Sequence, residues 1–281
     1  MSAVEGLLLV DKPKGRSSHD VVDAVRRSLG TRKVGHAGTL DPMATGLLVL
    51  GVGRATRLLR FLGDLPKTYE GTARLGVETD TLDAEGRVLR TAEVRVTASR
   101  VRRAMRALVG ASLQRPPAYS AVRVGGRRLY EAARAGERLE AAPRPIRVEA
   151  FDLLGFEPPK VRFRVVCSGG TYVRVLVADV GLALGCGAHL ARLVRTAIGP
   201  FRLEDASAPD APGPLLPLER AVEHLPRLVL EPEEARVARH GSILGPAGIE
   251  GPYAVLDPEG RLIGLYRDEG GKARPEVVLA T

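Results

Sequence analysis

Tryptophan is absent from this 281-residue sequence, and cysteine occurs only twice, at Cys167 and Cys186. Two cysteines cannot complete a four-ligand metal cage and do not suggest a disulfide framework, so we expect neither a metal site nor an oxidising compartment. Aromatic residues make up only 4% of the chain. This scarcity argues against a stacking platform for long single-stranded nucleic acids.

Long apolar runs are missing as well. No run approaches the roughly 18 residues that a membrane-spanning helix needs. The N-terminal segment contains a short apolar patch but lacks the basic region of a signal peptide. We therefore expect a cytoplasmic protein, and the hydrophobic content of 44% indicates a globular one.

The positive charge is concentrated in one part of the chain. Residues 100–147 contain twelve arginines and only three acidic residues, so this window carries the entire net charge of +9. A solvated charged face usually mixes both signs, whereas a local excess of arginine is typical of a nucleic-acid contact. The sequence therefore favours a polyanionic partner.

One acidic residue stands in an unusual setting. Asp41 precedes Pro42 within the glycine-rich stretch of residues 35–53, and the apolar run Leu47–Leu50 follows it as a buried strand or the start of a helix. Proline holds the preceding residue in extended geometry, and the glycines permit close approach of another backbone or a ligand. Asp41 is thus either a carboxylate presented for chemistry or part of an ordinary Asp-Pro turn.

Periodicity predicts several regular elements. Residues 67–76 alternate as a strand that places Tyr69 on one face with small residues, which would leave room over its ring; the alternative is a core tyrosine with a bonded hydroxyl. A capping box at Ser17–Asp20 predicts a helix that ends at Gly30. Thr97 is expected to cap a second helix that runs through Val109.

Residues 115–145 have the composition of an insertion. Prolines lie near both ends, Gly125-Gly126 predicts a hairpin, and a short helical piece follows near Tyr130. Such an arginine-rich excursion could close over a polyanion. Its arginines Arg123, Arg127 and Arg128 are the ones that we expect to contact a nucleic acid.

An isolated cation, Arg174, follows the glycine pair at residues 169–170 and precedes an apolar segment, residues 175–184, that is typical of a helix. An arginine at the edge of an apolar segment normally needs an anionic partner, and Asp41 is a candidate. If residues 171–174 are extended, Tyr172 and Arg174 project from the same side.

With these pieces assembled, the chain resembles the TruB family of bacterial tRNA pseudouridine-55 synthases over nearly its whole length. The resemblance rests on six blocks in the family's order: GLLLVDKPKGRSS, GHAGTLDPMATGLLVLGVGRATR, KTYEGTARLG, QRPPAYSAVRVGGRRLYEAARAG, CSGGTYVRVLVADVG and GCGAHLARLVR. It implies an α+β catalytic core with a central antiparallel sheet over residues 1–225, and an RNA-clasping insertion at about 115–145. A small β-rich, PUA-like domain over residues 226–281 would follow.

The resemblance also implies the roles of individual residues. Asp41 would be the catalytic aspartate, paired with Arg174, and Tyr69 would stack on the target uracil and accept a proton late in the reaction. Tyr172 and Leu193 would line the base pocket. His36 would contact RNA next to the flipped nucleotide, and Lys12 and Pro13 would support the site.

The implied reaction converts uridine 55 of the tRNA T-loop to pseudouridine. It moves the glycosidic bond from N1 to C5 with no redox change, so no cofactor is expected, and the sequence contains no glycine-rich cofactor fingerprint. The base must be flipped out of its stack, and an arginine beside Asp41 should lower the pKa of its carboxyl group by about 1–3 units. Whether Asp41 attacks a carbon or removes the 2′ proton is left open.

Two other functions are alternatives to a stand-alone tRNA pseudouridine synthase. A guide-RNA-dependent pseudouridine synthase subunit would require guide and protein partners, whereas the resemblance to the stand-alone family implies a monomer that acts on the T-arm of tRNA. An RNA-binding or RNA-folding protein without turnover would have no use for Asp41, Tyr69 and Arg174 together.

Overall fold

A computed structural model describes residues 4–137 and 139–279. Its main feature is a nine-stranded sheet whose seven principal strands run in the order β1-β3-β12-β4-β11-β10-β7. These strands are β1 (Gly6–Lys12), β3 (Thr45–Val52), β12 (Ala188–Ile198), β4 (Lys67–Leu75), β11 (Lys160–Cys167), β10 (Arg144–Glu157) and β7 (Gly110–Gln114). The short strands β2 (Val34–His36) and β13 (Phe201–Arg202) pair with β3 and β12.

All pairings in this sheet are antiparallel except that of β3 with β12. The α+β class with a central antiparallel sheet is therefore confirmed. At the parallel pairing, Gly46 has a φ of +100°, and a Cβ there would lie 2.4 Å from the carbonyl oxygen of Arg195. Only glycine permits this approach, which brings β12 beside the strand that follows the Asp41 loop.

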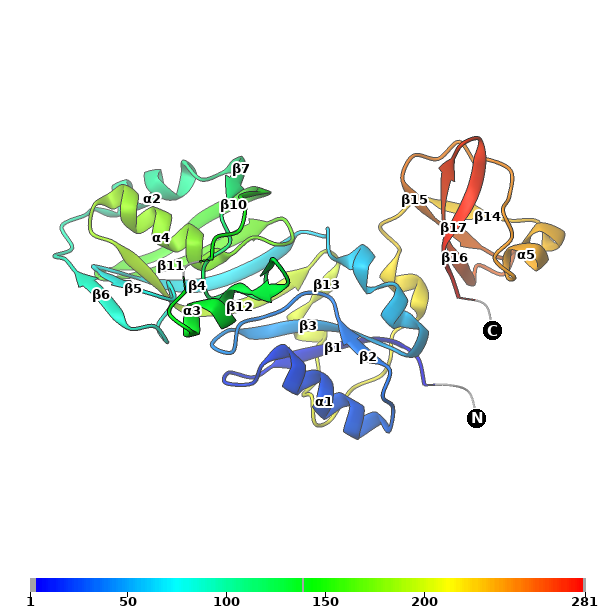
Figure 1. Ribbon diagram of the computed structural model, residues 1–281, viewed down its shortest axis with the longest axis horizontal. Coiled ribbons are helices and arrows are strands. Elements are labelled where there is room, and N and C mark those ends of the chain that lie inside the picture. Colours follow the sequence, from blue (N-terminus) through cyan, green and yellow to red (C-terminus); the bar gives the residue numbers. More distant parts are fainter. Residues whose placement is uncertain (1–3, 138, 280–281) are drawn as a thin grey trace.

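Three helices pack on the sheet: α1 (Ser18–Leu29), α2 (Ala98–Arg106) and α4 (Val173–Leu184). The predicted capping box of α1 is present, and Gly30 ends the helix in the left-handed conformation. Thr97 caps α2 as expected, but this helix ends at Arg106, earlier than the predicted Val109. In Figure 1, α2 and α4 cover one part of the sheet, and α1 lies under β1 and β3 at the opposite end.

Helix α4 begins two residues earlier than predicted. Tyr172 is its extended N-cap residue, and Arg174 lies in its first turn. The condition that residues 171–174 are extended is therefore not met, because the apolar residues that pack into the core start at Val173.

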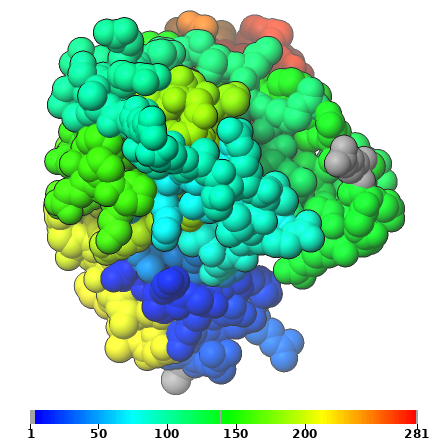
Figure 2. All heavy atoms as spheres, turned by 90° about the vertical axis from the view of Figure 1, so that its left-hand side faces the viewer, coloured from blue at the N-terminus to red at the C-terminus, as the bar shows by residue number. Residues whose placement is uncertain are grey.

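Residues 115–145 contain the predicted hairpin and short helix. The hairpin pairs β8 (Arg123–Val124) with β9 (Arg127–Arg128), and α3 (Leu129–Arg134) follows directly. Between β4 and α2 the chain forms a second two-stranded pair, β5 (Val77–Thr79) with β6 (Val88–Thr91). In Figure 2 the green insertion projects at the right-hand side, next to the cyan segment that contains this pair.

The C-terminal part forms its own four-stranded sheet, in the order β14-β15-β16-β17. Its elements are β14 (Arg227–Val229), α5 (Pro232–Ala238), β15 (Pro252–Leu256), β16 (Leu262–Glu269) and β17 (Lys272–Val278). Sequence periodicity missed β14 and α5, which are too short to show a period. Where one domain ends and the next begins stays a prediction.

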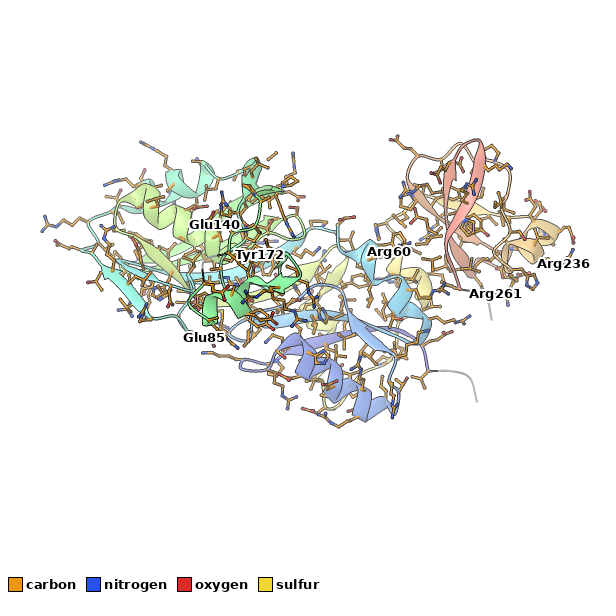
Figure 3. The ribbon with its side chains drawn as sticks, in the orientation of Figure 1. Arg60, Glu85, Glu140, Tyr172, Arg236 and Arg261 are labelled. Carbon is orange, nitrogen blue, oxygen red and sulfur yellow. The ribbon has the colours of Figure 1, made fainter. Side chains whose placement is uncertain are left out.

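The C-terminal sheet packs against two short 3-10 helices, η1 (Gly53–Arg57) and η2 (Leu59–Leu62). Arg60 of η2 forms an ion pair of 3.1 Å with Glu276 of β17. Figure 3 shows Arg60 on the side that faces this sheet, far from Tyr172, while Arg236 and Arg261 lie on the C-terminal part itself. None of the described helices is long and apolar enough to cross a membrane.

Candidate active site

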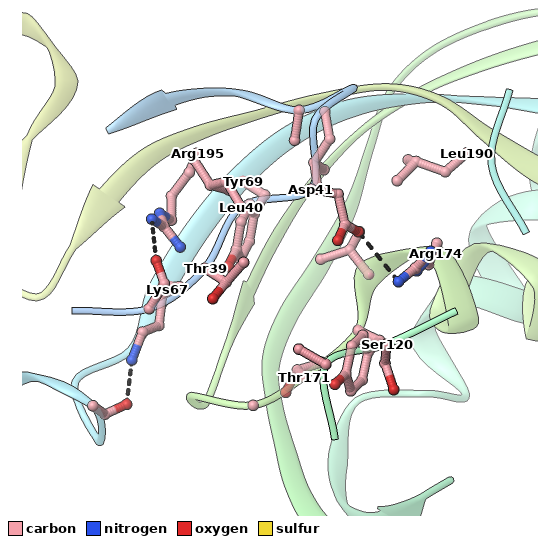
Figure 4. Close-up of a pocket in the computed structure, with 18 residues that line it drawn as sticks. Thr39, Leu40, Asp41, Lys67, Tyr69, Ser120, Thr171, Arg174, Leu190 and Arg195 are labelled. Atoms are coloured by element: carbon pink, nitrogen blue, oxygen red, sulfur yellow. Dashed lines mark hydrogen bonds and ion pairs between the residues drawn. The ribbon is translucent and has the colours of Figure 1, made fainter. Parts of the chain in front are cut away.

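A cavity of about 350 Å³ lies where the loop between β2 and β3, together with β4 and β12, meets the start of α4 and the insertion. Five of the residues singled out from the sequence line it together: Asp41, Tyr69, Tyr172, Arg174 and Leu193. They come from four separate parts of the chain, and Figure 4 shows Asp41 opposite Arg174 with Tyr69 to one side. The catalytic roles of these residues stay predictions, but their convergence in one cavity is a property of the fold.

Hydrogen bonds from the end of β1 and the start of α1 hold the loop that carries Asp41. The Ser18 hydroxyl donates to the carbonyl of Leu40 at 3.2 Å and accepts from its amide at 2.9 Å. The buried ammonium of Lys12 donates to the carbonyls of Arg16 at 2.6 Å and Pro42 at 3.3 Å. Lys12 thus has the supporting place expected for it, and burial lowers its pKa to about 8.

Arg174 is the centre of the site's polar contacts. Its Nη2 lies 3.4 Å from Oδ2 of Asp41 and donates to the carbonyl of Tyr119 at 2.7 Å. Its Nη1 donates to Oδ2 of Asp83 and to the carbonyl of Thr81, both at 3.3 Å. The predicted pairing of Asp41 with Arg174 is therefore present, but Arg174 also has a second carboxylate partner.

Asp83 was missed by the sequence reasoning. It lies in the turn between β5 and β6, its side chain is 6% exposed, and the Thr81 hydroxyl donates to it at 2.6 Å. The only local signal was an aspartate in the turn-like stretch TDTLDAEG, which is equally typical of a surface loop. Nothing in the local sequence connects it with an arginine 91 residues away.

The pKa of Asp41 departs from the sequence expectation. Burial raises the pKa of this carboxyl group, the negative charge of Asp83 adds to the rise, and Arg174 and Lys12 oppose it. The net direction is upward, so the prediction of a lowered pKa was wrong. The physical reason is that the loss of hydration on burial outweighs the attraction of Arg174, whose positive charge also faces the second carboxylate, Asp83.

Tyr69 lies on β4 and is 8% exposed. The space beside it at Gly71 is filled, since a Cβ at Gly71 would lie 2.4 Å from the ring of Phe163. Burial raises the pKa of the Tyr69 hydroxyl, an effect that nearby Arg195 opposes. The phenol is therefore protonated at neutral pH, and it can accept a proton only while releasing its own.

Arg195 is a second residue that the sequence reasoning passed over. It is 1% exposed, and its guanidinium donates to the carbonyls of Leu47 at 2.7 Å and Gly38 at 3.1 Å. Gly38 belongs to the Asp41 loop, so Arg195 anchors that loop to β12 while lying near Tyr69 (Figure 4). Its signal in the sequence was weak, because the same strand also contains His189 and Arg192.

Tyr172 is fixed at its backbone by Gln114 of β7. The Gln114 carboxamide accepts from the Tyr172 amide at 2.7 Å and donates to its carbonyl at 3.2 Å. The guanidinium carbon of Arg174 lies 5.8 Å from the centre of the Tyr172 ring. Both side chains therefore reach the cavity from the start of α4, although the backbone between them is helical.

A larger groove of about 1030 Å³ adjoins the cavity. His36 lines this groove and not the inner cavity. Burial lowers the pKa of the His36 imidazole, so the ring is neutral at neutral pH. The insertion contributes Arg123, Arg128 and Arg134 to the same groove.

The three arginines predicted to bind RNA are not equivalent. Arg123 and Arg128 line the groove, and Arg128 donates to the hydroxyl of Tyr130 at 2.8 Å. Arg127 does not line it and instead forms a two-pronged pair with Glu137, at 2.7 and 3.1 Å. The charge of Arg127 is thus partly neutralised within the insertion.

Comparison with protein families gives three matches along the chain. The model for the TruB family pseudouridylate synthase N-terminal domain matches residues 26–173. The model for the tRNA pseudouridylate synthase B C-terminal domain matches residues 174–210, and that for the tRNA pseudouridine synthase II C-terminal domain matches residues 225–280.

Individual proteins are similar over almost the full length. The chain is 45% identical to tRNA pseudouridine synthase B of Aromatoleum aromaticum, with 99% of this chain and 94% of that protein covered. It is 46% identical to tRNA pseudouridine synthase B of Thermobifida fusca, with 98% and 99% covered. Among solved structures, a Cbf5-Nop10-Gar1 complex contains a chain that superposes with a TM-score of 0.76 at 27% identity, covering 98% of this chain and 85% of that one.

Proposed function

The chain belongs to the TruB family and isomerises uridine to pseudouridine in tRNA, and from this premise we propose that it modifies uridine 55 of the T-loop with Asp41 as its catalytic residue. The observation that carries the assignment of Asp41 is its place in the cavity. It is the carboxylate that lines both the inner cavity and the groove while facing a buried arginine at 3.4 Å.

The inner cavity suits a flipped base. A uracil within the stack of a folded tRNA is out of reach, so extrusion at a cost of a few kcal/mol must precede the reaction. The rings of Tyr69 and Tyr172 in the cavity wall can replace the lost stacking, which is worth about 1–3 kcal/mol per base. Leu193 closes the apolar part of the same wall.

Asp41 acts in its ionised form in both versions of the reaction. As a nucleophile it attacks a carbon of the target nucleotide, and as a base it removes the 2′ proton of the ribose. In either case the N1–C1′ bond breaks, the base turns, C5 joins C1′ and loses its proton, and N1 gains one. The bond between Asp41 and the carbon breaks again in the first version, and Asp41 returns the 2′ proton in the second. Arg174 keeps a positive charge beside the carboxylate, which favours its ionised form against the effect of burial.

Tyr69 has two proposed roles, which we expect to contribute unequally to the reaction. Its ring lines the cavity and in this proposal stacks on the uracil, a role that needs no change of protonation. Acceptance of the C5 proton after the new bond has formed requires the protonated phenol to pass its own proton on. We therefore expect stacking to be its larger contribution.

The groove is the proposed binding surface for the T-arm. Arg123, Arg128 and Arg134 provide positive charge from the insertion, and neutral His36 lines the same groove. Phosphate contacts supply most of the affinity and fix the register, while the fit of the base in the cavity supplies the selection. We propose that the protein acts as a monomer, in the cytoplasm, and without an obligate protein partner.

A second candidate is guide-dependent action, which the structural similarity to the Cbf5-Nop10-Gar1 complex brings into view. The identity of 27% to that chain, against 45% and 46% to two tRNA pseudouridine synthase B proteins, favours stand-alone action. The deciding experiment incubates the purified protein with bare tRNA transcript and maps pseudouridine at single-nucleotide resolution. Modification at position 55 supports the proposal, and no modification without a guide RNA and partners would overturn it.

A further inference from the structure

Ser120 is a buried polar residue at the root of the insertion to which the reaction as described assigns no role. It is 5% exposed, and its hydroxyl oxygen has no hydrogen-bond partner among the described residues. A buried hydroxyl that is left unpaired is unfavourable, so such groups are usually satisfied by another partner. An unpaired hydroxyl in the wall of a binding cavity is therefore a candidate for contact with a ligand.

The backbone around Ser120 is held on both sides. The carbonyl of Tyr119 accepts from Nη2 of Arg174 at 2.7 Å, and the carbonyl of Ser120 accepts from the amide of Tyr130 at 3.1 Å. One contact ties the segment to the catalytic arginine, and the other ties it to α3 of the insertion. Because both neighbouring carbonyls are engaged, the position of the Ser120 side chain is set by the fold.

The position of Ser120 indicates which part of the substrate it meets. A small group of residues lines both the inner cavity and the outer groove: Thr39, Leu40, Asp41, Ser120, Ala121 and Arg174. With the base in the cavity and the RNA backbone in the groove, the ribose of the target nucleotide has to lie at this junction. Asp41 belongs to the same group, as it must if it reacts at a ribose carbon, and Figure 4 shows Ser120 and Asp41 on different sides of the cavity.

We propose that Ser120 is a substrate-binding residue whose hydroxyl hydrogen-bonds the ribose 2′-hydroxyl of the target nucleotide. A serine hydroxyl both donates and accepts, and so does a 2′-hydroxyl, the group by which a protein distinguishes RNA from DNA at a given site. The contact holds the sugar against Asp41 and makes the site selective for a ribonucleotide. This inference rests on the proposed function of the cavity and adds the recognition of the sugar.

The test compares two T-arm hairpins that differ only at the target position, one with uridine and the other with 2′-deoxyuridine. Dissociation constants are measured for the wild type, Ser120→Ala, Ser120→Thr and Ser99→Ala. Threonine keeps the hydroxyl, and Ser99 is an exposed serine of α2 outside both cavities. Thermal unfolding of each variant checks that it is folded.

The wild type should bind the uridine hairpin more tightly than the deoxyuridine hairpin. Ser120→Ala should reduce this preference by roughly 3- to 10-fold, the range of one neutral hydrogen bond, by weakening binding of the uridine hairpin alone. Ser120→Thr and Ser99→Ala should keep the preference. Equal weakening of both hairpins by Ser120→Ala, an unchanged preference, or no preference in the wild type would each overturn the inference.

Failure of this inference is distinguishable from failure of the proposed function. Pseudouridine formation by the wild type is measured on the same uridine hairpin. If the wild type forms pseudouridine but Ser120 does not affect the preference for ribose, only the proposed ribose contact is refuted. If the wild type forms no pseudouridine on the hairpin or on whole tRNA, the proposed function itself is refuted.

Discussion

Arg174 and Asp83 face each other in the interior, with Nη1 and Oδ2 3.3 Å apart and side-chain exposures of 5% and 6%. The same guanidinium reaches Asp41, which is far more exposed at 43%. Asp83 therefore fixes the orientation of Arg174, whose other guanidinium nitrogen faces the carboxylate of Asp41 in the cavity. Its orientation depends on a residue that does not line the inner cavity.

We expect Asp83→Asn to lower kcat by at least about tenfold, or about 1.4 kcal/mol, because Arg174 loses the charge that orients it. The variant should also lose about 1–3 kcal/mol of unfolding free energy, less than a fully broken buried pair costs, since Asp41 still faces Arg174. Single-turnover assays and denaturant unfolding measure the two effects. Asp80→Asn, in the same turn but paired with Arg87 at 3.9 Å, is the matched control. Wild-type kcat in Asp83→Asn would contradict the orienting role.

Asp41→Asn should abolish turnover while the affinity for tRNA stays within about tenfold, because phosphate contacts carry most of the binding. The folded protein holds the Asp41 proton more tightly than the unfolded chain does, since the pKa is raised. Ionised Asp41 therefore costs folding free energy at neutral pH, and the neutral variant should be no less stable than the wild type. Filter binding, turnover assays and thermal unfolding at pH 7 measure the three quantities. Turnover near that of the wild type would refute the assignment of Asp41.

The pH dependence of kcat/KM should show an acid limb that lies above the range of an ordinary aspartate. Asp41 is inactive when protonated, and its pKa is raised, so activity is lost as the pH falls through that raised value. Removal of the Asp83 charge removes one cause of the rise. The limb of Asp83→Asn should therefore move to lower pH, and a shift to higher pH would contradict the proposed coupling of the two carboxylates.

Arg174→Lys should lower kcat by about 100-fold or more. The guanidinium donates to two backbone carbonyls and to Asp83 while it faces Asp41. A lysine ammonium is a point charge on a flexible stem and cannot reproduce this planar set of contacts. Single-turnover kinetics on T-arm hairpins measure the loss. Full activity of this variant would mean that the planar pair with Asp41 is dispensable.

Arg123→Gln and Arg128→Gln should each weaken tRNA binding and reduce the salt slope of log K by about 0.7–0.9 for each phosphate that is no longer neutralised. Arg127→Gln should have a smaller effect, because Arg127 is already paired with Glu137 and lies outside the groove. All three arginines lie on the β8–β9 hairpin of the protein, and each variant removes one positive charge, so the variants serve as controls for each other. An equal reduction of the slope in all three would show that Arg127 leaves Glu137 and contacts phosphate.

Local sequence was enough to predict elements whose stabilising contacts are local. The capping box at Ser17 and the left-handed Gly30 delimit α1, because both act through backbone groups within one turn. The alternation of residues 67–75 predicts β4, since one face of that strand is buried. Family motifs, in addition, brought attention to Asp41, Tyr69, Tyr172, Arg174 and Leu193 before any of them could be placed in space.

The excess of arginine in the insertion and the residue types available for the reaction follow from composition and short-range pattern. The class of the fold was expected from the resemblance to the family. Which charged residues pair with one another does not follow from the sequence pattern, because these pairs form only when the chain folds. Folding joined Asp83 to Arg174 across 91 positions, turned the pKa of Asp41 upward, and paired Arg127 with Glu137. The physical reason is that burial and charge–charge energies depend on distances in space, which residues far apart in the chain acquire only in the folded protein.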